Sequence, residues 1–133
     1  MITHLLDTNI VSDLVRHPNG VAVERLVRLG SESVCTSIIV AAELRYGAIK
    51  KKSQALTRQL EIVLSRLPVL PFAEPADQIY GEIRASLEQA GRVIGQHDML
   101  IAAHALAADC TLVTDNGREF TRIKSLRVEN WLR

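Results

Sequence analysis

Short apolar segments alternate along the chain with longer segments of helical periodicity. Residues 2–6 are mostly apolar and are followed at once by polar Asp7, a pattern typical of a buried strand that ends at a helix-capping turn. Residues 21–29 place apolar side chains at helical spacing and end at Gly30, as an amphipathic helix does. The pattern predicts strands at 2–6, 33–36, 69–70, 111–114 and 126–128, and helices around 11–15 and at 21–29, 38–50, 54–67, 75–90 and 98–108.

The alternation of strands and helices predicts an α/β fold. Strands that are joined through helices form right-handed crossovers and a mainly parallel sheet with helices on both faces. The 133 residues match the length of one domain, and the sequence contains no repeat, linker or low-complexity segment. We therefore expect a single domain over residues 1–133.

The composition is that of a globular protein with little net charge. Apolar residues make up 47% of the chain, and 16 basic against 15 acidic residues leave a net charge of +1. Such a chain does not bind nucleic acid through bulk charge, so any contact of this kind needs a local basic patch. Cys35 and Cys110 lack the spacing of a zinc site and are expected to be reduced core thiols. Without a signal sequence or a membrane-spanning segment, we expect a cytoplasmic, soluble protein.

Polar side chains gather where predicted strands end or predicted helices begin. Asp7 follows the first strand, and Asp115 and Asn116 follow the strand at 111–114. Asp98 opens the most apolar of the predicted helices. Because ligands of open parallel sheets bind beyond the carboxyl ends of the strands, we expect these side chains to lie near one another.

Glu43 is the most informative acid because it lies within an apolar helical stripe. Ile39 precedes it by one turn and Tyr46 follows three residues later, so the carboxylate is expected to be buried. A buried carboxylate costs free energy unless its pKa rises, a cation pairs with it, or it binds a charged ligand. Arg45 points about 100° away around the helix, so a bound metal ion is the interpretation that fits best.

Each acid taken alone also has an ordinary structural explanation. Asp7 fits a helix N-cap, Asp98 a first-turn acid and Asp115 a turn residue. Together, however, carboxylates at one sheet edge repel unless a cation holds them. A set of oxygen ligands favours Mg²⁺ or Mn²⁺ over zinc and suits phosphoryl transfer to water. His97 and His104 are two helical turns apart, too far to share a metal ion, so His104 is expected to be a core or surface residue.

A family resemblance rests on groups of residues spread over the whole chain. They are Asp7-Thr8-Asn9 after the first strand, Glu43 within residues 39–47, Asp98 within residues 98–105, and the closing segments 113–120 and 127–131. In this order they resemble the PIN-domain ribonucleases and, more narrowly, the VapC toxins of type II toxin-antitoxin pairs.

The resemblance implies a three-layer α/β/α fold and a Mg²⁺-dependent endoribonuclease that halts translation by cleaving tRNA or another structured RNA. It also implies a homodimer and a cognate VapB-type antitoxin that blocks the site. The three central acids of the family fall on Asp7, Glu43 and Asp98, which would be catalytic and hold the metal ion. At the fourth catalytic position Asn116 stands in register and Asp115 sits beside it.

RNA contacts require positive charge in a local patch, and two groups of cations are dense enough. One is Arg45 together with residues 50–52, although three lysines at a helix end also occur as a solvated terminus. The other follows the acidic turn, and Arg118 is its best candidate because it lies within a few residues of that turn. The cations expected to contact RNA are Arg45, Arg118, Arg122 and Lys124.

Two other functions remain open at this point. A receiver-like phosphoacceptor signalling module shares this length, a parallel sheet, an acidic edge and a metal ion. It needs adjacent acids after the first strand, whereas Asp7 is followed here by Thr8 and Asn9. A non-catalytic PIN-like RNA-binding domain is the second alternative, and it would be expected to lack one of the acids.

Overall fold

The computed structural model describes residues Met1 to Arg133 and has a five-stranded sheet at its centre. The strands are β1 (His4–Leu6), β2 (Val34–Ser37), β3 (Val69–Leu70), β4 (Thr111–Val113) and β5 (Val128–Glu129). They are all parallel and lie in the order β3-β2-β1-β4-β5. The first strand is therefore central, with its carboxyl end between those of β2 and β4.

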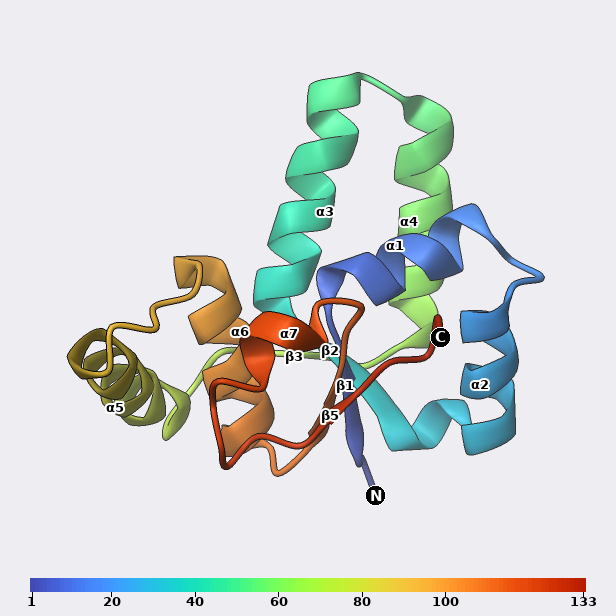
Figure 1. Cartoon of the computed structure of the whole chain (residues 1–133). Helices are drawn as coiled ribbons and strands as arrows, with labels where there is room; N and C mark the ends of the chain where they lie inside the picture. Colours follow the sequence, from blue (N-terminus) through green and yellow to red (C-terminus); the bar gives the residue numbers. More distant parts are fainter.

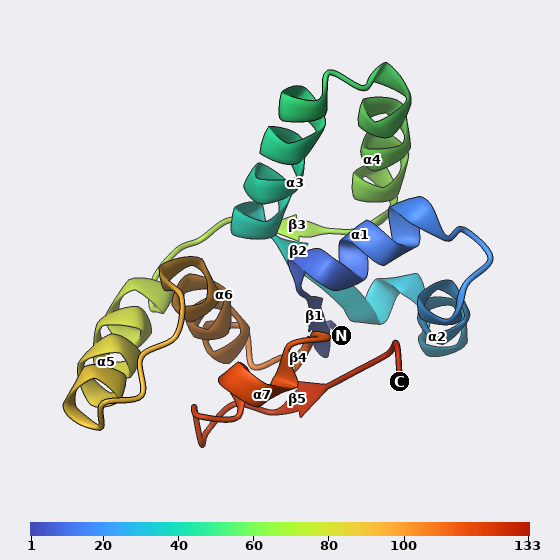
Figure 2. The ribbon, with the colours of Figure 1, turned by 45° about the horizontal axis from the view of Figure 1, so that its top comes forward.

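Helices cover both faces of this sheet. They are α1 (Thr8–Arg16), α2 (Val21–Leu29), α3 (Ile38–Lys51), α4 (Gln54–Arg66), α5 (Ala76–Gln89), α6 (Gln96–Ala107) and α7 (Gly117–Phe120), with a 3₁₀ turn η1 (Ser31–Ser33) before β2. Helices α1 and α2 lie on one side of the sheet and α5 and α6 on the other, while α3 and α4 form a hairpin that extends away from it (Figures 1 and 2). The predicted three-layer α/β/α architecture with a parallel sheet is confirmed.

One cluster of 30 buried apolar residues joins the sheet to its helices. Leu5 and Leu112 on the central strands have no exposed surface, which accounts for the apolar character of these short segments. Trp131, 1% exposed, anchors the end of the chain to the same core. Cys35 and Cys110 are buried free thiols, as expected. Every helix is too short or too polar to cross a membrane.

The structure differs from the predicted elements in its shortest segments. Helix α6 begins at Gln96, so Asp98 is its third residue rather than its first. The strand predicted at 126–128 overlaps β5 at Val128 only, because β5 runs from Val128 to Glu129 and Leu126 before it is buried in the core. The sequence pattern does not reveal η1 or α7, since segments of three or four residues are too short to show periodicity.

Candidate active site

Asp7 lies where β1 ends and α1 begins, and its side chain is held from two sides. Oδ1 accepts a hydrogen bond of 2.7 Å from the backbone N–H of Thr8, so Asp7 is also the N-cap of α1. Oδ2 accepts a hydrogen bond of 2.7 Å from the hydroxyl of buried Thr114, which follows β4. Burial raises the pKa of the Asp7 carboxyl, and the two hydrogen bonds oppose that shift. Asp7 is thus a fixed, buried carboxylate.

Thr114 connects the turn after β1 with the turn after β4. Besides donating to Asp7, its Oγ1 accepts a hydrogen bond of 3.0 Å from the backbone N–H of Asn116. Asn9 adds a second connection, because its Oδ1 accepts a hydrogen bond of 3.0 Å from the backbone N–H of Asp115. The carboxyl ends of two neighbouring strands are therefore fixed to each other by side chains.

Glu43 reaches the same region from α3. Its Oε2 accepts a hydrogen bond of 3.2 Å from the hydroxyl of Thr8, the residue next to Asp7. Its Oε1 is buried and has no hydrogen-bond partner, and the Nδ1 of His97 lies 3.9 Å from it. The side chain as a whole is 30% exposed, so the expected burial holds for Oε1 but not for the whole side chain.

Ser37 and His104 fix the start of α3, and with it the position of Glu43. The Ser37 hydroxyl caps the helix by accepting a hydrogen bond of 3.0 Å from the backbone N–H of Ile39. It also shares a hydrogen bond of 2.7 Å with the Nδ1 of His104, which is 4% exposed. Burial lowers the pKa of His104. His104 is therefore a core histidine, one of the two expected settings.

Asp98 is the acid whose pKa shows the effect of the surrounding negative charge most clearly. Its pKa is raised from 3.8 to about 6, chiefly because burial disfavours the charged form. Repulsion from the carboxylates of Asp7, Glu119 and Glu43 adds to the shift, in that order, while His97 opposes it. The three acids named from the sequence thus lie within one electrostatic environment.

Glu119 is a member of this acidic group that the sequence reasoning missed. It lies in the first turn of α7, which directly follows the turn after β4. Its charge acts on Asp98 more strongly than that of Glu43 does. No local pattern marks Glu119 in the sequence, because the four residues of α7 are too few to show helical periodicity.

Asp115 and Asn116 are held differently from the other candidates. The Asp115 carboxylate accepts hydrogen bonds from Asn130 Nδ2 at 2.9 Å and from Arg133 Nε at 3.1 Å. These two bonds lower the pKa of Asp115. Asn116 precedes α7, and its side chain makes no capping hydrogen bond. Asp115 is therefore compensated by the end of the chain, whereas the Asn116 amide is uncommitted.

Two of the cations predicted to contact RNA lie on elements that also carry an acid. Arg45 on α3 forms an ion pair with Glu61 of α4, so much of its charge is already compensated. Arg118 on α7 is exposed, and its side chain forms no ion pair. Of these two, Arg118 is the one that has charge available for a phosphate group.

Arg122 and Lys124 lie elsewhere. Both line a hollow of about 940 Å³ between α5 and the segment that follows α7, and none of the acidic residues described above lines it. Arg122 also donates a hydrogen bond of 3.1 Å to the carbonyl of Val93. The structure does not bring these two cations together with the acids.

The donor set suits a hard divalent cation. Every candidate ligand is an oxygen, and the partnerless Oε1 of Glu43 is a buried acceptor in need of a positive group. No three carboxylate, histidine or cysteine side chains converge into a complete ligand set. Mg²⁺ is commonly held by one or two carboxylates and several waters, so the residues present fit such an ion.

Comparisons with known proteins show the family of this chain. The model of the PIN domain family matches residues 4–126. The chain is 43% identical over 130 residues to the ribonuclease VapC2 of Rickettsia felis, covering 96% of this chain and 97% of that protein. It is 37% identical over 134 residues to the tRNA(fMet)-specific endonuclease VapC of Shigella flexneri, covering 98% and 99% of the two chains.

A solved structure of similar fold leads to the same group of proteins. It is the crystal structure of VapBC2 from Rickettsia felis bound to a DNA fragment from its promoter. The TM-score is 0.91 at 42% sequence identity, and the match covers 98% of this chain and 99% of that one. At this level of similarity the two chains share one fold over almost their whole lengths.

Proposed function

Since the chain belongs to the PIN-domain family and, within it, to the VapC ribonucleases, we propose that it is a metal-dependent endoribonuclease and the toxin of a type II toxin-antitoxin pair. PIN-domain VapC nucleases are in general dependent on a divalent metal ion. We assign Mg²⁺ to this chain, with Mn²⁺ as a substitute, because all candidate ligands are oxygens. The observation that supports the proposal best is the environment of Asp98, where burial and three neighbouring carboxylates raise the pKa to about 6.

Each acid has a distinct task in this proposal. Asp7 and Asp98 hold the metal ion, Asp7 because Thr114 fixes its carboxylate and Asp98 because its charge is unfavourable without a cation. Glu43 is the third acid of the site. Its Oε1, which has no hydrogen-bond partner within the chain, accepts a hydrogen bond from the attacking water and so orients the water towards phosphorus. A divalent metal ion held by these residues would lower the pKa of a bound water and neutralise charge on the phosphate oxygens. Glu119 adds negative charge that raises the pKa of Asp98 further.

The fourth position of the site is assigned to Glu119 and the Asn116 amide rather than to Asp115. Asp115 accepts hydrogen bonds from Asn130 and Arg133, and these bonds lower its pKa. Asn116 has an uncommitted amide at the start of α7, where its oxygen can contact a water of the metal ion. We expect Asp115 to contribute only long-range negative charge.

The partners follow from relatives of high similarity. The substrate is an RNA, and a tRNA fits because the Shigella flexneri relative is named for one. The similar crystal structure from Rickettsia felis contains VapB together with VapC, so a VapB-type antitoxin is the proposed protein partner. We also propose a homodimer, and a cytoplasmic location, where buried free thiols such as Cys35 stay reduced.

Residues 1–133 are proposed to act as a single domain. One buried cluster includes residues from the first strand to Trp131. A segment that shares a core with the rest of the chain is not expected to fold separately.

The two alternative functions are separated by specific observations. A receiver-like module has the strand order 2-1-3-4-5, whereas this sheet has the order β3-β2-β1-β4-β5. A non-catalytic RNA-binding domain is disfavoured because Asp7, Glu43 and Asp98 share one electrostatic environment, as a catalytic site requires.

Incubation of the purified chain with labelled tRNA tests the proposal. We expect cleavage in Mg²⁺ or Mn²⁺, none in excess EDTA, and recovery when Mg²⁺ is added back in excess. Co-expression with the neighbouring small open reading frame should relieve growth arrest. Cleavage that continues in EDTA would contradict the metal-dependent mechanism, and a chain that cleaves no RNA under any of these conditions would contradict the function itself.

A further inference from the structure

One face of α3 leads from the acids to the tip of the α3–α4 hairpin, and the fold makes little use of it. At 100° per residue, Glu43, Tyr46, Gly47 and Lys50 lie within an arc of about 100°. The Tyr46 ring is 64% exposed, and the Lys50 ammonium lies 5.8 Å from its centroid. An exposed aromatic ring next to a cation buries little surface within the chain, so this face is available to another molecule.

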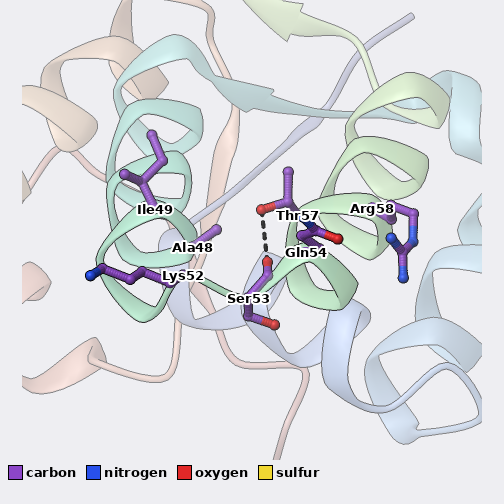
Figure 3. A pocket seen from close by; sticks show the side chains of 7 residues that line it. All are labelled: Ala48, Ile49, Lys52, Ser53, Gln54, Thr57 and Arg58. Atoms are coloured by element: carbon purple, nitrogen blue, oxygen red, sulfur yellow. Dashed lines mark hydrogen bonds between the residues drawn. The ribbon is translucent and has the colours of Figure 1, made fainter.

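The hairpin tip is strongly basic, and its charge is uncompensated. The four exposed cations Lys50, Lys51, Lys52 and Arg58 take part in no ion pair, in contrast to Arg45, which pairs with Glu61. Figure 3 shows a hollow of about 460 Å³ at this tip, with Lys52 and Arg58 pointing away from each other on either side of it. In a chain whose net charge is only +1, this is a local patch that attracts an anionic partner.

Gly47 lies one helical turn from Glu43. Because glycine has no side chain, the helix backbone on this face is uncovered at that position. A Cβ atom placed at Gly47 would meet no heavy atom within 4 Å, so packing does not require a glycine here. Glycine inside a helix is less stable than alanine, because its backbone is freer in the unfolded chain. Gly81 in α5 is equally uncrowded and also follows a tyrosine, Tyr80, but α5 carries none of the acids of the site.

We propose that single-stranded RNA runs along this face of α3, from the acids towards the hairpin tip, with one base stacked on Tyr46 and a phosphate at Lys50. The inference rests on the proposed ribonuclease function and adds the path of its substrate. Glu43 and Lys50 are about 10 Å apart along the helix, which corresponds to about three stacked nucleotides at ~3.4 Å each. We call the face defined by Glu43, Tyr46, Gly47 and Lys50 the α3 track.

The chemistry of the α3 track favours RNA over a protein partner. Unpaired lysines contact phosphates, and an exposed aromatic ring stacks on any base, which is the combination used for single-stranded nucleic acids. The track also begins at Glu43, so a strand that lies on it already has a phosphodiester near the acids. A phosphate near four carboxylates needs the metal ion, whereas the lysines hold the rest of the strand without it.

Binding is best measured in an Asp98→Asn background, in which cleavage is removed, with a short fluorescent single-stranded RNA of mixed sequence as the probe. We expect Tyr46→Ala to weaken the affinity about tenfold, because a stacked base is lost. Tyr46→Phe keeps the ring and should bind as before. Lys50→Gln should weaken binding and reduce the salt dependence by about 0.7 in log–log slope, as expected for one phosphate contact to a single strand. Arg92→Gln, which removes an exposed cation without an ion pair from the hollow beside α5, is the matched control and should change nothing.

The two open glycines supply a second test that a purely structural role cannot imitate. Gly47→Ala and Gly81→Ala should both raise the midpoint of thermal unfolding, since both gain helix propensity in open space. Only Gly47→Ala should weaken RNA binding, because its methyl group obstructs the track. Equal RNA affinity in the two glycine variants would overturn the role of the track.

The outcomes separate this inference from the function on which it rests. If the native chain cleaves RNA in Mg²⁺ but Tyr46→Ala and Lys50→Gln bind the probe as the background variant does, the track is wrong and the function stands. If those substitutions leave RNA affinity intact and abolish binding of the antitoxin, the face belongs to the protein partner, which also overturns the proposal. If the native chain cleaves no RNA, the proposed function fails first.

Discussion

Two acids near the same sheet edge lie in opposite electrostatic environments. Burial and neighbouring carboxylates raise the pKa of Asp98 to about 6, whereas hydrogen bonds from Asn130 and Arg133 lower the pKa of Asp115. Asp98 therefore destabilises the fold when it is charged and no cation is bound, and Asp115 does not. This difference makes the two residues a matched pair for mutagenesis.

Replacing Asp98 by Asn should stabilise the metal-free protein at neutral pH. The folded-state pKa of about 6 lies above the usual 3.8, so the native state binds more protons than the unfolded state between these values. Stability thus falls as pH rises from about 4 to about 6 and stays low above. The expected gain for Asp98→Asn at pH 7 is about 1 kcal/mol, discounted for the partial exposure of Asp98.

Urea unfolding in EDTA at pH 4 and pH 7 measures this difference. The gain should be present at pH 7 and nearly absent at pH 4, where Asp98 is protonated in the native state. Asp115→Asn, whose carboxylate is favourably bonded, should give no gain at either pH. A stabilisation by Asp98→Asn that is the same at both pH values would refute the electrostatic explanation.

Thr114 should control the protonation of Asp7. Because its hydroxyl opposes the effect of burial on the Asp7 pKa, Thr114→Val should raise that pKa further and move the acid limb of the pH–rate profile for RNA cleavage to higher pH. The lost hydrogen bond to a buried carboxylate should also cost about 1–3 kcal/mol of unfolding free energy. Thr114→Ser keeps the hydroxyl and should restore the profile. A profile for the Val variant that matches the native one would show that Thr114 only packs.

At the scale of elements, the start of α3 determines where Glu43 lies. The Ser37 hydroxyl caps the helix and contacts buried His104, so Ser37→Ala should lower the unfolding free energy by about 1–2 kcal/mol and also reduce cleavage. Ser53→Ala removes the N-cap of α4, where the Ser53 hydroxyl accepts from Leu56 N–H at 3.1 Å. It should cost about 1 kcal/mol and leave cleavage unchanged. Chemical denaturation and an RNA cleavage assay distinguish the two caps, and an equal loss of activity in both variants would contradict a positioning role for Ser37.

The helices and strands show how much of the fold can be predicted from the sequence. The long helices and the buried strands are predicted within one or two residues at most ends, because their periodicity extends over several turns. The short helix α7 is not predicted, and Glu119 is missed with it. The compensation of Asp115 depends on Asn130 and Arg133, which follow it by many residues, so no local pattern reveals it.

At the scale of the whole molecule, the order of the strands in the sheet determines which side chains meet at the site. Asp7 leaves the central strand, Thr114 leaves its neighbour β4, and Glu43 follows β2 on the other side. Asp98 arrives from α6, on the face of the sheet opposite to α1 (Figure 2). Sequence alone predicts that strand ends share an edge, but the distances and the charge balance among these side chains depend on packing between distant segments.

The central claim is that four carboxylates on four different elements act together on RNA. The most direct measurement is the initial rate of tRNA cleavage in Mg²⁺ for Asp7→Asn, Glu43→Gln, Asp98→Asn and Glu119→Gln, with Asp115→Asn beside them as the control. We expect the first three variants to lose at least ~100-fold, Glu119→Gln to lose about tenfold or more, and Asp115→Asn to change only modestly. Native rates for Asp7→Asn or Asp98→Asn, or a loss in Asp115→Asn as complete as that in Asp7→Asn, would contradict the account.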